Sequence, residues 1–308
     1  LSDADLEAGK TDAHALAAIL ALVVVWWICE PIPLAMTAIL GAVLCVVLGI
    51  ADAKKTFAPF SDPVIYLFLG SFVLARAMMV HELDRRFVCA MLSLKGVGNR
   101  TNRILLVFGA ICAVISMWIS NTATAAMMFP IGIGITGTLA EMLSRKAGGP
   151  VDPRTLRYGT GLMLMTAYAA STGGIGTPVG TPPNLIGIAM IEKLVGVRIS
   201  FLQWMAFAVP LLIVMFGVLY LVIFLLHKPE LSRIEGGTAY VARERERLGA
   251  WSRGQKNALA AFLVTVTLWL VPGVLAVAGG EGDPAARAYA NHMPEAVAAL
   301  TGAILLFV

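Results

Sequence analysis

Charge is scarce in this chain of 308 residues. Aspartate, glutamate, lysine and arginine together make up 14% of the sequence, whereas apolar residues make up 58%. An ordinary soluble domain carries about 25% charged residues. The composition therefore excludes an ordinary soluble fold, and the net charge of +4 does not indicate a partner nucleic acid.

Groups that bind metals or carry out catalysis are also few. The four cysteines include no CxxC spacing, so we expect neither a disulfide framework nor a cysteine metal site. The four histidines lie in loops or at the ends of apolar runs, and no acidic pair lies within a run. An intramembrane enzyme would need a nucleophile with a base, or metal ligands, at membrane depth. An enzyme remains only a remote alternative, and no signal peptide is visible.

Long apolar runs, by contrast, recur along the whole sequence. They cover residues 14–30, 34–50, 63–80, 158–191 (with an interruption), 203–226, 258–278 and 294–308. A helix needs about 20 apolar residues to cross a bilayer. Spanning segments must be helical because lipid offers no hydrogen-bond partner to open backbone. The sequence thus predicts an all-α polytopic protein that crosses the lipid bilayer of the cell (inner) membrane several times.

Basic residues gather in three segments, 84–103, 139–157 and 227–257, which the positive-inside rule places in the cytoplasm. The apolar stretch of residues 103–145 therefore has both ends on one side, and each of its halves has only about 15 residues, which is short for a span. Its middle carries the polar tripeptide Ser120-Asn121-Thr122. We predict a re-entrant helical hairpin with this tripeptide at its tip, inside the protein, where irregular backbone is tolerated at membrane depth.

Three further elements follow from the pattern. Residues 81–95 predict an amphipathic helix along the inner interface. Four glycines and three prolines between Gly173 and Asn184 predict that the helix of residues 158–191 is broken. We expect loops at residues 279–293 and around Glu192 and Lys193.

Two pairs of segments indicate an internal repeat. Residues 14–27 (HALAAILALVVVWW) match residues 257–270 (NALAAFLVTVTLWL), and residues 33–47 match residues 294–308, with about half of the positions identical in each pair. The charge pattern gives the two members of the first pair opposite directions across the membrane, with residues 14–30 running inward and residues 258–278 outward, so the repeat is inverted, as in many secondary transporters. We expect the chain to be part of a longer protein with a second hairpin beyond Val308.

The two breaks carry the chemistry. Ser116 and Ser120 are four residues apart and would share a helix face. Serine and threonine cap helices, and Thr181 would cap a new helix with Pro182 at its first position. Helix N-termini at the tips would attract an anion, and carbonyls of the unwound glycine stretch would be available to a hard cation. One isolated serine in a membrane helix more often bonds its own backbone.

At these breaks the sequence resembles the divalent anion/sodium symporter family, the di- and tricarboxylate transporters. The similarity lies in Trp26-Trp27 with Glu30-Pro31-Ile32-Pro33, in the segment Met117 to Thr124, and in Gly180-Thr181-Pro182-Pro183-Asn184, and it covers essentially the whole chain. The resemblance implies a homodimer whose protomers each have a scaffold and a moving transport domain, and elevator-type, Na⁺-driven transport of a dicarboxylate such as succinate.

The resemblance also implies roles for single residues. Sodium would be bound by Ser116, Ser120, Asn121 and Gly180, and substrate carboxylates by Asn121, Thr122 and Thr181. The implied organisation has scaffold helices and the interfacial helix in 1–95, half of the transport domain in 96–200, a scaffold helix and cytoplasmic loop in 201–256, and the start of the second repeat in 257–308. Sodium-independent anion exchange on the same fold stays open, as does the choice among dicarboxylate, tricarboxylate and sulfate.

The repeat makes a prediction about the rest of the gene. Sequencing beyond the codon for Val308 should reveal a second Ser-Asn-Thr-like tripeptide followed by another proline-containing break, because an inverted repeat duplicates both. A continuation without them would contradict the repeat.

Overall fold

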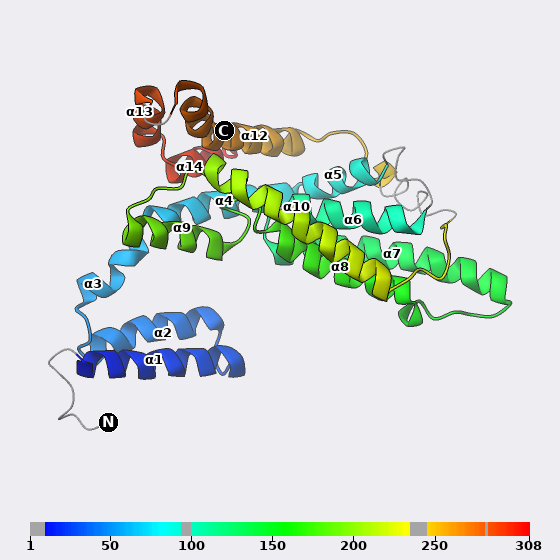
Figure 1. The fold of residues 1–308 in the computed structure, drawn as a ribbon, viewed down its shortest axis with the longest axis horizontal. Coiled ribbons are helices and arrows are strands. Elements are labelled where there is room, and N and C mark those ends of the chain that lie inside the picture. The colour runs from blue at the N-terminus through cyan, green and yellow to red at the C-terminus, as the bar shows by residue number, and fades with distance from the viewer. Residues whose placement is uncertain (1–9, 94–99, 235–244, 281–282) are drawn as a thin grey trace. The chain divides into compact units, whose positions relative to one another are not determined.

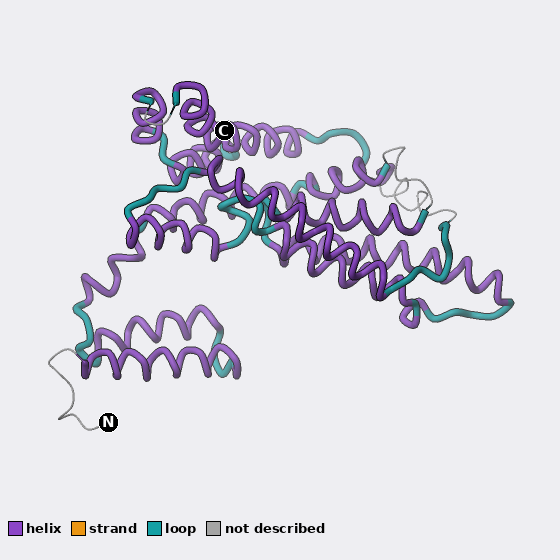
Figure 2. The backbone as a smooth tube through the Cα atoms, in the orientation of Figure 1, coloured by secondary structure: helices purple, strands orange, loops and turns teal. Residues whose placement is uncertain are grey.

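The structure is a computed structural model that describes residues 10–93, 100–234, 245–280 and 283–308 (Figure 1). In these ranges the chain is helical, with one isolated antiparallel bridge between Arg100 and Arg233 as the sole β pairing (Figure 2). The helices are α1 (Lys10–Cys29), α2 (Leu34–Val47), α3 (Ala53–Phe57), α4 (Pro63–Val80), α5 (Leu83–Leu92), α6 (Thr101–Ser116), α7 (Asn121–Ala147), α8 (Arg157–Gly173), α9 (Pro182–Val195), α10 (Phe201–Leu226), α12 (Arg253–Gly279), α13 (Pro284–His292) and α14 (Glu295–Leu305).

The chain divides into two units, and the first comprises residues 1–65. Within it α1 and α2 form a helical hairpin. The chain reverses at Glu30, which adopts a left-handed conformation with φ of 47°. Its N–H donates to the carbonyl of Trp26 at 2.8 Å, and the indole Nε1 of Trp27 donates to the carbonyl of Leu34 at 3.1 Å. The two Trp residues thus fasten the turn between α1 and α2.

The second unit comprises residues 66–308, and α8 is at its centre. Figure 1 shows α6, α7, α8 and α10 running alongside one another, and α8 contacts the other three. Tyr158, Leu162, Met165 and Ala169 are fully buried because their spacing places them on one face of α8. The phenol of Tyr158 donates to the carbonyl of Thr101 at 2.7 Å, which ties the start of α8 to the start of α6.

The lengths of the helices suit a membrane protein. Among the described residues, five helices are long and apolar enough to cross a bilayer, namely α1, α4, α7, α10 and α12. The helices α2, α6 and α14 are apolar but shorter. Every apolar run identified in the sequence is helical, and residues 158–191 are interrupted as predicted, so the all-α polytopic fold is confirmed.

The sequence-based boundaries were wrong in three places. The second arm of the hairpin has 27 residues, not about 15, because α7 continues to Ala147 through good helix formers such as Glu141 and Lys146. The helix α9 runs to Val195 and includes Glu192 and Lys193. The expected loop 279–293 contains α13, which starts where Asp283 accepts the N–H groups of two following residues, as N-caps do.

The predicted amphipathic segment 81–95 is helical over Leu83–Leu92 as α5, its residues 94 and 95 lie outside the described residues, and its position at a membrane interface stays a prediction. Leu83 and Val88 are fully buried. Arg86 donates to the carbonyls of Leu248 and Gly249 and lies over the ring of Trp251 at 4.9 Å from the centroid. These contacts fasten α5 to the segment that leads into α12.

Because α8 approaches α6 closely at Gly173, adding a single methyl group at this position should lower the stability of the protein. A Cβ at Gly173 would overlap the backbone of Ala113, whereas a Cβ at Gly137 would meet nothing within 4 Å. Because backbone atoms cannot move aside as a flexible side chain does, Gly173→Ala should destabilise the protein by about 1–3 kcal/mol. Thermal unfolding in detergent would measure the change. Gly137→Ala is the matched control, and equal melting temperatures for the two variants would contradict this packing.

Candidate functional site

The first helix break lies between α6 and α7. The helix α6 ends at Ser116, and α7 begins at Asn121 with Ser120 as its N-cap. The Oγ of Ser120 accepts the N–H of Ala123 at 3.3 Å, as the sequence predicts for a cap. The expectation that Ser116 and Ser120 share one helix face was wrong, because the helix stops before the turn that would bring them together.

Ser116 instead contacts the second residue of the tripeptide. Its Oγ, which is fully buried, donates to Oδ1 of Asn121 at 2.7 Å. A hydroxyl and an amide oxygen are therefore held next to each other across the break. Both are neutral oxygen ligands of the kind that hard cations accept.

The turn between the two helices is anchored by an aromatic group. The ring of Trp118 stacks on Phe201 of α10, with centroids 6.2 Å apart, and meets Phe262 of α12 edge-on at 5.5 Å. Phe201 in turn stacks on Trp269 at 4.9 Å. The next residue in the turn, Ile119, is 3% exposed. The tip is thus fixed on one side by aromatic packing.

The second break lies between α8 and α9, which end and begin at Gly173 and Pro182. Thr181 occupies the N-cap position and Pro182 the first helical position, as predicted. The side chain of Thr181, however, makes no capping hydrogen bond. The unwound stretch forms tight turns of its own, in which the N–H of Gly176 donates to the carbonyl of Gly173 at 2.9 Å.

Thr177 ties the two breaks together. Its Oγ1 donates to the carbonyl of Met117 in the first break and accepts the N–H of Gly180 in the second at 3.1 Å. Two glycines permit the approach: a Cβ at Gly174 would overlap Oδ1 of Asn121, and a Cβ at Gly180 would lie 2.9 Å from the carbonyl oxygen of Met117. The structure therefore brings Ser116, Asn121 and Gly180 into one small region.

Several carbonyls of the second break are already engaged. The amide Nδ2 of Asn184, a buried side chain, donates to the carbonyls of Gly174 and Thr177 at 2.8 Å each. The indole of Trp204 donates to the carbonyl of Ile175 at 2.9 Å. The expectation that the whole stretch offers unoccupied carbonyls was therefore wrong. Among the described residues no such donor meets the carbonyl of Gly180, a buried residue, and the same holds for the carbonyls of Gly176, Pro178 and Val179.

Sequence reasoning missed three residues of this region. Thr177 and Asn184 form hydrogen bonds with backbone groups of the two breaks. Their signal in the sequence is a polar side chain within or beside a Gly/Pro-rich stretch, where unpaired backbone groups need partners. The third is Thr124, one turn into α7, which is fully buried and whose Oγ1 has no hydrogen-bond partner within the described parts of the chain. An unsatisfied buried hydroxyl costs about 1–3 kcal/mol, so a nearby ion or water would stabilise it.

The remaining predicted residues face outward. Ser120 and Thr122 are exposed and Thr181 is half-buried, so the tip is covered on one side only, although a tip enclosed by protein was expected. In the described residues no cluster of His, Cys, Asp or Glu could hold a metal ion. The chemistry of the site therefore rests on hydroxyl, amide and carbonyl oxygens, which suit a monovalent hard cation, and on the N-termini of α7 and α9.

Comparison with known proteins identifies the family. The family described as "Sodium:sulfate symporter transmembrane region" matches residues 8–308. The chain belongs to this family. It is a transporter family and not an enzyme family, and its members cross the cell membrane several times.

Curated relatives agree with this assignment. The chain is 33% identical over 246 residues to a "Sodium-dependent dicarboxylate transporter SdcS" of Staphylococcus saprophyticus, which covers 80% of this chain and 46% of the relative. A protein of the same name from Staphylococcus aureus strain USA300 is 31% identical over the same coverage. The chain thus spans about half the length of the curated relatives it matches.

The link between the breaks predicts the effect of one substitution. Thr177→Val keeps the side-chain shape but removes two hydrogen bonds, leaving a buried N–H and a carbonyl without their partner. The free energy of unfolding should fall by about 1–3 kcal/mol, measured by thermal denaturation in detergent. Thr138→Val is the control, since that hydroxyl bonds only the carbonyl of Gly134 in its own helix. A loss no larger than the control's would show that Thr177 does not join the breaks.

Proposed function

We propose that the whole protein is a secondary active transporter that couples Na⁺ to the uptake of dicarboxylates such as succinate. The observation that carries the proposal is the meeting of two interrupted helices at a group of neutral oxygens. Broken helices that present N-termini to an anion and carbonyls to Na⁺ are an established transporter design. The names of the relatives, which are sodium-dependent dicarboxylate transporters, support this substrate and this ion.

The sodium ion, as co-substrate, would be held by Ser116, Ser120, Asn121 and the carbonyl of Gly180. Three of these are supported by contacts: Ser116 bonds Asn121 directly, and both Asn121 and Gly180 pack against Gly174. Ser120 begins the same helix as Asn121. The unpaired Oγ1 of Thr124 adds a further oxygen on the first turn of α7. Oxygen ligands without a formal charge suit an ion that must also be released.

Substrate carboxylates would bind Asn121, Thr122 and Thr181 at the N-termini of α7 and α9. The partial positive charge of a helix N-terminus, roughly half an elementary charge, attracts an anion without a cationic side chain. Sodium at the adjacent oxygens would add its charge to the same field. Cooperative binding follows, because an occupied sodium site raises the affinity for the carboxylate and a bound carboxylate raises the affinity for sodium by the same factor.

The proposal extends to the architecture of the whole protein. Residues 96–200 would form half of a transport domain, and residues 1–95 and 201–256 would contribute to a scaffold. Residues 257–308 would begin the second, inverted repeat. The exposed side of the tip at Ser120 and Thr122 would then be covered by the equivalent tip of that repeat. Two protomers would form a homodimer in which each transport domain moves as an elevator.

Uptake of labelled succinate tests this function. The full-length protein in proteoliposomes should take up succinate with Na⁺ outside and not with choline. Ser116→Ala removes one sodium oxygen and the partner of Asn121, so the sodium concentration for half-maximal uptake should rise about tenfold, as expected for loss of one contact to a charged group.

The control is Thr267→Ala, since Thr267 bonds only the carbonyl of Leu263 in its own helix. This variant should retain the sodium dependence of the unaltered protein. Uptake that persists in choline but requires dicarboxylate inside the vesicles would instead establish sodium-independent exchange. Uptake of sulfate or of a tricarboxylate in place of succinate would correct the substrate.

A further inference from the structure

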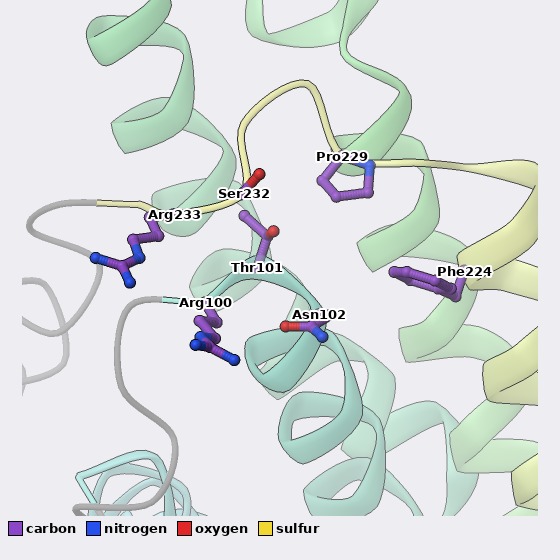
Figure 3. A pocket seen from close by; sticks show the side chains of 7 residues that line it. All are labelled: Arg100, Thr101, Asn102, Phe224, Pro229, Ser232 and Arg233. Carbon is purple, nitrogen blue, oxygen red and sulfur yellow. The ribbon is translucent and has the colours of Figure 1, made fainter.

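A pocket of about 400 Å³ lies at the opposite end of α6 from the helix breaks (Figure 3). It forms where the start of α6 meets the segment that follows α10. Seven residues line it: Arg100, Thr101, Asn102, Phe224, Pro229, Ser232 and Arg233. None of them belongs to the candidate transport site.

The wall of this pocket is firmly built. Arg100 and Arg233 form the isolated antiparallel bridge, and Thr101, which is 1% exposed, donates from its N–H to the carbonyl of Ser232 at 3.2 Å. The Oγ1 of Thr101 donates to the carbonyl of Leu231 at 2.9 Å. Segments 130 residues apart in sequence are thereby fixed against each other, so the two arginines are held as a pair.

Within the described residues the pair lacks a compensating negative charge. Opposed like charges destabilise a bridge, yet no carboxylate lines the pocket and neither arginine forms an ion pair within the described residues. The nearby Glu230 is directed elsewhere, because its Oε1 accepts the N–H of Arg157 at 2.6 Å. Two arginines on paired segments of backbone, lining one pocket with no carboxylate among its lining residues, offer the donors that bind a phosphate, which arginine contacts in bidentate fashion.

The other end of the pocket is apolar. Figure 3 shows the two arginines at one end and Phe224 at the other, with Asn102 between them. Phe224 lies in the last turn of α10, a 26-residue apolar helix, so the pocket opens where a membrane span ends. Basic pockets at the cytoplasmic ends of spans receive the headgroups of anionic lipids, and the basic segment 227–257 is expected in the cytoplasm.

We propose that this pocket binds the phosphate of an anionic phospholipid, with the headgroup on Arg100 and Arg233 and the first part of an acyl chain on Phe224. The bound lipid would connect the first arm of the hairpin to the end of α10. A free phosphate ion shares the headgroup chemistry but has no acyl chain to place on Phe224, so the amphipathic lining favours the lipid.

Native mass spectrometry of the full-length protein in detergent tests the proposal. Separate arms contain phosphatidylglycerol, phosphatidylcholine or inorganic phosphate. The unaltered protein should retain phosphatidylglycerol in preference to the other two. The double variant Arg100→Gln/Arg233→Gln should bind phosphatidylglycerol about tenfold more weakly, whereas Arg154→Gln, at an exposed arginine away from the pocket, should not.

Three results would overturn the proposal. They are equal retention of phosphatidylglycerol and phosphatidylcholine by the unaltered protein, unchanged binding in the double variant, and binding of inorganic phosphate without retention of lipid. The lipid preference of the unaltered protein is measured independently of the variants. If the double variant shows no thermal unfolding transition and is therefore misfolded, the comparison of phosphatidylglycerol with phosphatidylcholine in the unaltered protein still tests the proposal.

Discussion

The structure depends on satisfying backbone polar groups where two membrane helices are interrupted. Each unpaired N–H or carbonyl away from water costs several kcal/mol in a lipid environment. The chain meets this demand by placing the two interruptions against each other, so that the second supplies a hydrogen bond to the first. Thr177 donates to one break from the other, and Asn184 reaches back from α9 into the stretch before it. The oxygens that we propose as sodium ligands lie directly beside these hydrogen bonds.

This constraint explains why the candidate site lacks charged side chains. A carboxylate at the same place would need its own partner, because an unpaired charge at membrane depth is costly. Hydroxyl, amide and carbonyl oxygens exert a weaker field, and helix N-termini supply the positive end of a dipole without a buried cation. The residues that hold the backbone together and those that would hold the ligands are therefore neighbours of the same chemical type.

Much of this could be predicted from the sequence, because the strongest signals are long apolar runs and the clustering of basic residues between them. Those signals correctly placed a helix in each apolar run and located both breaks. They did not predict the end of α7, where helix propensity extends the helix beyond its apolar part. They also did not predict α13, where a capping aspartate starts a helix in a polar segment. The partners within the breaks were beyond reach, since spacing along one chain does not show that Thr177 meets Met117 or that Ser116 meets Asn121.

The aromatic stack beneath the tip has a consequence for motion. Trp118, Phe201 and Trp269 meet with interplanar angles of 17° and 13°, so their faces are nearly parallel. Interlocked aliphatic side chains must separate before they can shift, which opens voids in a closely packed interior, whereas offset ring faces keep contact over a range of displacements. The stacked faces therefore hold the tip against separation and keep their contact through small displacements parallel to the rings, whereas the edge-on contact of Trp118 with Phe262 limits larger ones.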